Sequence, residues 1–255
     1  VISHNVESLV PGQFRNGGQR ECLGIEMKMF RQAGMTVTIS MEETLFLRGL
    51  GGCARYFPYY PASEQATALQ NIRVARMHGT DRSVLLLGSA VNPPTFHGMK
   101  RVCKRWAADG LFDAAGPLRM AGFGTHGLNE GHPHVEVLGP LSQDDLAREL
   151  ATNRLAICYQ EEGAGALTRI RELLLAGVPV VANRHAARSY HGEPGLFEFD
   201  DWCECGHAVR LAGAFDMASV APVGPPPAEK LVRDLKTLLF DGKLPRSASR
   251  ERVTL

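Results

Sequence analysis

The chain has 255 residues, of which 44% are hydrophobic and 22% charged, and its formal net charge is +1. The length and composition are those of a folded globular protein with one large or two small domains. The near-neutral net charge gives no sign of a nucleic-acid partner or of an acidic tail. No apolar run approaches the ~20 residues of a transmembrane helix, and no segment has the composition of a cleavable signal peptide.

The chain begins with Val1 and not with methionine, and its first five residues, VISHN, are predicted to be a strand end followed by a loop. We therefore interpret the sequence as a fragment or a processed product. The next residues alternate between helix and strand patterns: we expect helices at 17–33 and 42–50 and strands at 35–40 and 54–59. This alternation predicts βαβ units and a parallel sheet. Because 61–80 is polar and has little strand signal, we place a domain boundary there and assign residues 1–62 to an incomplete α/β domain.

A second and longer alternating series begins near residue 83. The strands expected are 83–88, 118–121, 134–138, 154–159, 178–182 and 196–199, and the helices expected are 96–108, 143–151 and 167–176. We therefore expect residues 63–218 to form a doubly wound parallel sheet with helices on both faces. Residues 219–255 are interpreted as a proline-rich linker at 219–227, an amphipathic helix at 228–240 and a frayed polar tail.

The stretch from 161 to 183, EEGAGALTRIRELLLAGVPVVAN, contains the residues best suited to bind a ligand. Gly163 and Gly165 predict a flexible turn that a ligand can approach closely, and the turn leads directly into a helix. The first amides of a helix are unpaired and lie at the positive end of its dipole, so this arrangement favours an anion such as phosphate. Glu172, about one turn into the helix, has a carboxylate that can accept hydrogen bonds from sugar hydroxyls. The alternative is that Arg169 and Glu172 form a surface ion pair and the glycines form a simple loop.

This stretch resembles the donor-site motif of retaining GT-B glycosyltransferases of the family 4 or group 1 type. In that motif a glycine-rich loop precedes a helix that carries a glutamate, and the sequence AxGVPVVA follows. The matching residues here are Glu172, Ala176, Gly177, Val178, Pro179, Val180, Val181 and Ala182. Many members carry another glutamate eight residues before the helix glutamate; Ala164 holds that position here, with Glu161 and Glu162 close by. Weaker similarities follow the family's order over about residues 1–215, and the front of the family's N-terminal domain is absent.

The resemblance implies both a fold and a function. The fold is GT-B, with a Rossmann-like nucleotide-sugar-binding domain at 63–218 and the rear part of an acceptor-side domain at 1–62. The implied reaction moves a hexosyl group from a nucleoside diphosphate sugar to a hydroxyl of a sugar, lipid or other acceptor, with retention of configuration. The implied donor-binding residues are Gly88, Ser89, Gly163, Ala164, Gly165, Leu167, Thr168, Arg169 and Glu172, and the catalytic candidates are His4 and Glu162.

A second glycine motif, GFGTHG at 122–127, matches the pattern GxGxxG and follows a predicted strand. Dinucleotide binding requires a helix of several turns to begin at such a loop. Gly131 and Pro133 interrupt the short segment before the next strand, so we reject NAD or FAD binding, although the loop can still line the donor cleft. Beyond Gly88, Asn92 stands where many family members have an arginine. Arg169 is therefore the expected phosphate cation, with Lys100 as the alternative.

The remaining cysteine and histidine patterns predict no metal site. The six cysteines are scattered, which favours free thiols in a reducing compartment. The cluster Cys203-x-Cys205-x-His207 lacks a common zinc spacing, and no DxD motif occurs. We therefore expect no divalent metal, no cofactor and no nucleic-acid partner, and a cytoplasmic location that allows peripheral attachment to the inner face of a membrane. The sequence does not indicate an oligomeric state.

Two alternative functions remain open. One is a GT-B epimerase or hydrolase that acts on the same nucleotide sugar, and the other is a fragment that binds a nucleotide sugar without catalysis. Acceptor contacts in the family come largely from the N-terminal domain, whose front is missing here. We therefore expect residues 1–255 alone to transfer sugar poorly or not at all.

Overall fold

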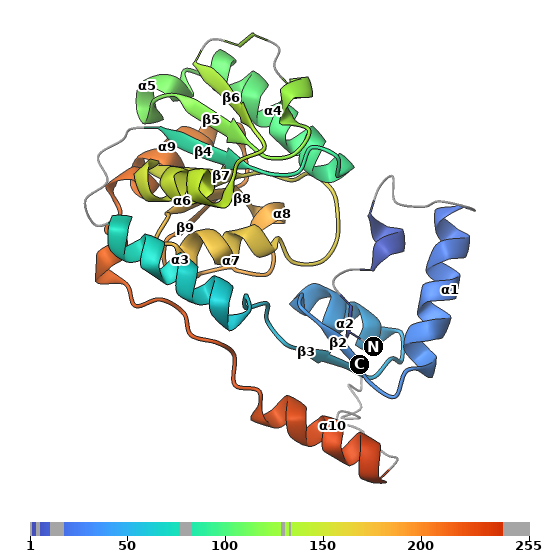
Figure 1. The fold of residues 1–255 in the computed structure, drawn as a ribbon. Helices are drawn as coiled ribbons and strands as arrows, with labels where there is room; N and C mark the ends of the chain where they lie inside the picture. The colour runs from blue at the N-terminus through green and yellow to red at the C-terminus, as the bar shows by residue number, and fades with distance from the viewer. Residues whose placement is uncertain are drawn as a thin grey trace, which may run out of the picture.

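The computed structural model describes residues 2–3, 6–10, 18–76, 83–128, 131–132 and 134–241. The described residues form two separate parallel sheets, one of three strands and one of six (Figure 1). The two sheets follow each other along the chain, as the sequence predicts. The exact limits of the domains, 1–62, 63–218 and 219–255, stay a prediction.

The three-stranded sheet has the order β1-β2-β3 and is parallel throughout. Its strands are β1 (Ile2–Ser3), β2 (Thr36–Thr38) and β3 (Ala54–Tyr56), and its helices are α1 (Gln19–Gln32), α2 (Met41–Gly49) and the 3₁₀ turn η1 (Glu7–Leu9). Met27 and Phe30 of α1 and Leu47 of α2 pack in one small core with Val6 and Ala54. The predicted helices and strands of this part are therefore confirmed.

The six-stranded sheet has the order β6-β5-β4-β7-β8-β9, with every neighbouring pair parallel. Its strands are β4 (Val84–Leu87), β5 (Leu118–Ala121), β6 (Val135–Gly139), β7 (Leu155–Cys158), β8 (Val180–Asn183) and β9 (Leu196–Phe199). The chain winds outward from β4 through β5 to β6, and then returns to β7 on the other side of β4. The predicted doubly wound parallel sheet is confirmed, and its switch point lies between β4 and β7.

Helices cover both faces of this sheet because successive strand residues point to opposite faces. Val84 and Leu86 of β4 join the core beneath one set of helices, whereas Leu85 joins the core beneath the other. The first face carries α4 (Pro93–Ala108), α5 (Leu111–Ala115) and α9 (Trp202–Ala214), and the second carries α3 (Ser63–Arg76), α6 (Gln143–Thr152), α7 (Thr168–Leu175) and α8 (Arg184–Ala187). Burial on both faces explains why the strands are apolar runs and not alternating patterns.

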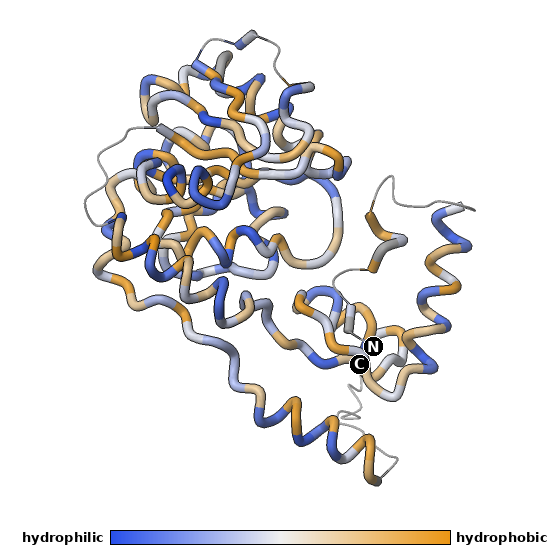
Figure 2. Tube along the Cα trace, viewed as in Figure 1, coloured by the Kyte–Doolittle hydropathy of each residue, from blue (hydrophilic) through white to orange (hydrophobic). Residues whose placement is uncertain are grey.

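Figure 2 colours the chain by hydropathy: the strands inside are orange, which marks hydrophobic residues, and the covering helices have mixed colours. The last described helix, α10 (Glu229–Asp241), alternates orange and blue along its length (Figure 2). It follows the extended segment 220–228 and lies beside the three-stranded sheet, where Arg55 Nε donates to Asp234 Oδ2 over 2.7 Å (Figure 1). Among the described helices, none combines the length and the apolar character that crossing a membrane demands.

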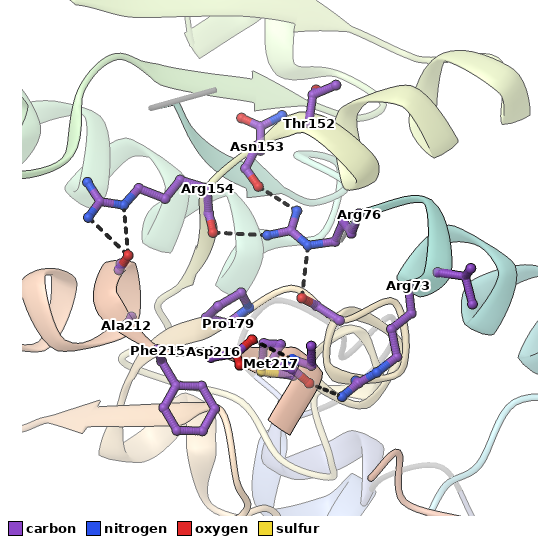
Figure 3. Close-up of a pocket in the computed structure, with 14 residues that line it drawn as sticks. Arg73, Arg76, Thr152, Asn153, Arg154, Pro179, Ala212, Phe215, Asp216 and Met217 are labelled. Carbon is purple, nitrogen blue, oxygen red and sulfur yellow. Dashed lines mark hydrogen bonds between the residues drawn. The ribbon is translucent and has the colours of Figure 1, made fainter. Parts of the chain in front are cut away.

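The segment 61–80, interpreted from its polarity as a boundary, contains a helix of 14 residues, α3. Few of its side chains are apolar and buried, chiefly Ala66 and Leu69. Arginines attach the end of α3 to the sheet unit instead (Figure 3). Arg76 donates to the carbonyls of Leu150, Asn153, Arg154 and Gly177, and Arg73 donates to those of Leu174, Met217 and Val220.

These arginines border a cavity of about 410 Å³ at the amino ends of β7 and β8 (Figure 3). Burial, and the nearby charge of Arg73, lower the pKa of Arg76 to about 10. The backbone carbonyls take up most of the guanidinium N–H groups, so we interpret the cluster as a structural clamp.

Candidate functional site

The predicted ligand residues gather at the carboxyl edge of the six-stranded sheet, opposite the arginine clamp. Two connections leave this edge at the switch point: Gly88–Asn92 after β4 and Tyr159–Leu167 after β7. Gly98 of α4 lies so close to the second connection that a Cβ atom there would overlap the carbonyl oxygen of Tyr159. Crevices at such switch points are the usual ligand sites of doubly wound sheets.

The glycine turn that precedes α7 has the backbone conformation that glycine allows. Gly163 has φ of 111° and Gly165 has φ of 75°, both in the region that other residues rarely adopt. The helix then begins at Thr168, and the N-cap residue Leu167 makes no side-chain cap. The side chain of Leu167 is buried in the core, so any contact of this residue with a donor would come from its backbone.

Arg188, which the sequence analysis did not single out, holds the carbonyl side of this turn. Its Nε donates to the Gly165 carbonyl over 2.7 Å and its Nη2 donates to the Ala164 carbonyl over 2.9 Å. Its Nη1 donates to the His185 carbonyl over 2.6 Å. The guanidinium therefore neutralises the carbonyl oxygens that would repel an anion at the turn.

Arg169 reaches from the first turn of α7 to the end of β4. Its Nη1 donates to the Leu87 carbonyl and its Nη2 donates to Thr95 Oγ1 over 3.2 Å. Its guanidinium fills the space beside Gly88, where an added Cβ would lie 2.5 Å from Nη1. The fold thus brings Gly88, Thr95 and Arg169 together, with Ser89 and Asn92 in the turn that follows. Burial lowers the pKa of Arg169, although its usual value is so high that the group stays charged.

Glu172, about one turn further along α7, reaches toward the segment that joins the two sheets. The hydroxyl of Tyr59 donates to Glu172 Oε1 over 2.6 Å, and Gln65 Nε2 donates to the same oxygen over 3.1 Å. Arg169 and Glu172 therefore each bind other partners, and the structure does not show the alternative of a simple surface ion pair between them. Burial and the hydrogen bond to the carboxylate raise the pKa of Tyr59, so its phenol stays protonated.

The acidic residues before the turn are held by α4. Glu162, a catalytic candidate, contacts His97 Nδ1 over 2.8 Å. Glu161 pairs with Arg101 over 3.0 Å and accepts from the Tyr159 hydroxyl over 2.7 Å. These contacts are exposed, and they place His97, a residue without a predicted role, next to the glycine turn.

Of the other candidates, His4 lies outside the described residues, as does its neighbour Asn5. Lys100, the alternative cation, lies on the exposed side of α4. The GFGTHG loop packs against the end of β4, because a Cβ at Gly122 would overlap the Gly88 carbonyl. It continues into the 3₁₀ turn η2 (Thr125–Leu128) and not into a helix of several turns. No disulfide forms among the described residues, which include all six cysteines, and the described side chains contain no cluster of three or more metal-ligating groups.

The smaller unit contributes Glu43 of α2 to this region. The Val6 amide donates to Glu43 Oε1 over 2.6 Å. Burial raises the pKa of Glu43 to about 7, although the amides of Val6 and Gly165 and the charge of Arg188 act in the opposite direction. A second contact joins Ser189 Oγ and Glu42 Oε2 over 3.3 Å. The two units therefore meet at the glycine turn and its arginine.

Comparison with solved structures identifies similar folds. TarM matches with a TM-score of 0.62 and 11% identity over 94% of this chain and 49% of its own. WaaG, a glycosyltransferase involved in lipopolysaccharide biosynthesis, matches with a TM-score of 0.56 and 14% identity over 77% of this chain and 59% of its own. HepE from Anabaena, in complex with UDP, matches with a TM-score of 0.54 and 13% identity over 93% of this chain and 72% of its own.

These likenesses establish the predicted GT-B, Rossmann-like fold. The chain spans about half the length of TarM. Among sequences, no protein-family model and no curated protein matches the chain.

Proposed function

We propose that this chain is the nucleotide-sugar-binding part of a GT-B glycosyltransferase. The observation that carries the proposal is the glycine turn at the switch point, whose carbonyls are bound by Arg188, together with Arg169, which binds the end of β4 beside Gly88. The likeness to a glycosyltransferase and to a UDP-bound protein supports the same assignment.

In the proposed binding mode, the diphosphate of the donor lies between the turn and the end of β4. The amides at the start of α7 and the positive end of its dipole attract the phosphates. Arg169 and the Gly88–Ser89 backbone bind from the opposite side. Glu172 accepts hydrogen bonds from the ribose hydroxyls.

The proposed reaction is transfer of a hexosyl group to an acceptor hydroxyl, with retention of configuration and without a metal ion. As the glycosidic bond breaks, negative charge grows on the departing diphosphate. Donors fixed in place before the reaction stabilise that charge without further reorganisation. Glu162, held by His97, and His4 are proposed to lie near the reacting sugar. We propose a cytoplasmic protein that can attach to the inner face of a membrane.

Titration calorimetry tests the donor site. UDP, GDP and ADP are titrated into the protein, followed by the corresponding nucleosides. We expect at least one diphosphate to bind, and Arg169→Ala to weaken the diphosphate while leaving its nucleoside unchanged, because the proposed partner of Arg169 is phosphate. Arg148→Ala is the matched control, since the Arg148 side chain is exposed and its guanidinium pairs with Asp145. The proposal fails if the parent chain binds none of the three diphosphates.

The reaction itself is tested by release of nucleoside diphosphate from nucleotide sugars with and without an acceptor. Acceptor-dependent release supports transfer, whereas release without acceptor would indicate a hydrolase. Isomerisation of the sugar without release would indicate an epimerase.

A further inference from the structure

The carboxylate proposed to bind ribose is already held by two side chains from outside its own helix. Tyr59 belongs to the segment between β3 and α3, and Gln65 belongs to the first turns of α3. Both groups donate to Oε1 of Glu172, over 2.6 Å and 3.1 Å. Among the described residues, Oε2 of this carboxylate has no hydrogen-bond or ion-pair partner.

An ionised carboxylate has two oxygens and about four sites that accept hydrogen bonds. Two donors on Oε1 fix the rotation of the group and direct Oε2 away from Tyr59. A glutamate side chain that is free to rotate would lose that freedom when it binds a ligand, which weakens binding. The hydrogen bond from Tyr59 restricts the rotation of Glu172 before any ligand binds. Tyr59 can do this because its ring is rigid and its backbone belongs to the segment that follows β3.

We infer that Tyr59 is a positioning residue for ribose recognition: it locks Glu172 so that the free oxygen of the carboxylate receives the 2′- and 3′-hydroxyls of a ribonucleoside diphosphate. This inference rests on the proposed function and adds a specificity to it. The site selects ribonucleotides over nucleotides that lack these hydroxyls, and the strength of the selection depends on a residue outside the donor motif.

The inference also joins the two sheets. Tyr59 lies only a few residues beyond Tyr56, the end of β3, so the orientation of the smaller unit affects the position of the Glu172 carboxylate. Donor binding and the arrangement of the two units are therefore coupled through one hydrogen bond.

The test compares Tyr59→Phe with the parent in titrations of UDP, GDP and ADP and their 2′,3′-dideoxy forms. We expect the parent to prefer the ribonucleotide, and Tyr59→Phe to lose about 2- to 10-fold in ribonucleotide affinity, as for the loss of one ordered side chain. Binding of the dideoxy forms should not change. A purely structural role would weaken both forms together and leave their ratio constant.

Tyr60→Phe is the matched control, because Tyr60 is adjacent and packs against the core beneath α7. Gln65→Met is a second variant that removes the other donor and should lower the same ratio. The inference is overturned, with the proposed function intact, if the parent binds a diphosphate but Tyr59→Phe keeps the parent's preference. It is overturned together with the proposed function if the parent binds no diphosphate.

Discussion

Replacing Glu172 with glutamine separates ligand recognition from folding. Glutamine keeps the length, shape and helix propensity of glutamate, and its side-chain oxygen can still accept from Tyr59. The change removes the negative charge and puts an amide group where the second oxygen was. A hydrogen bond to a charged group contributes ~1.5–3 kcal/mol, so we expect the dissociation constant of a nucleoside diphosphate to rise by roughly ten- to a hundredfold.

The effect on stability should be much smaller. The Tyr59 bond becomes a neutral one, which costs ~1 kcal/mol or less, and this lowers the melting temperature of a chain of this size by about 2–4 °C. Calorimetric titration and thermal unfolding measure the two quantities. Glu64→Gln is the control, because Glu64 lies on the exposed side of α3 near Gln65 and undergoes the same chemical change. If Glu172→Gln binds the diphosphate as tightly as the parent does, the carboxylate has no part in recognition and the reasoning fails.

Two further predictions concern the buried charges. The pKa of Glu43 is raised from 4.5 to about 7 in the folded state, so between these values the folded protein binds more protons than the unfolded chain. The free energy of unfolding should therefore fall by about 3 kcal/mol between ~pH 4.5 and ~7.5 because of Glu43. Denaturant unfolding across this range should show the fall in the parent, and Glu43→Gln should flatten it; an unchanged slope would contradict a buried, proton-binding Glu43. Arg76→Met should destabilise the protein by ~3 kcal/mol or more, because each buried carbonyl left unpaired costs ~1–3 kcal/mol, whereas Arg148→Met at an exposed pair should cost less than ~1 kcal/mol. Equal losses in the two variants would refute the clamp.

The strands were predictable because their signal is local. Leu85 and its neighbours are buried on both sides, so the run of apolar residues identifies β4 without knowledge of its partners. The glycine turn and the start of α7 were predictable for the same reason, since the need for positive φ appears directly as Gly163 and Gly165.

The missed helices lack such a local signal. α3 is held to the sheet by arginines that bind backbone carbonyls and has no wide apolar face, so its sequence resembles a polar loop. α9 contains Gly206 and Gly213, which lower helix propensity, and the Arg154 guanidinium packs close to Gly213, where an added Cβ would lie 2.6 Å from it.

The missed site residues depend on contacts between distant parts of the chain. Tyr59 and Glu172 are separated by 113 residues, and the His97–Glu162 pair by 65. Arg188 recognises backbone carbonyls, which have no residue type to search for. Only the fold could bring these groups together.

The return of α10 to the smaller unit means that the chain connects the two sheets twice, once before α3 and once through 220–228. The contact between Arg55 and Asp234 is therefore intramolecular, and a short tether supplies an effective concentration on the order of millimolar. A contact too weak to hold two separate molecules together is then enough to keep α10 in place. The prolines of 220–228 favour an extended spacer and limit its slack. A single cut in this segment would turn the contact into a bimolecular one, and dilution alone would then release α10 from the smaller unit.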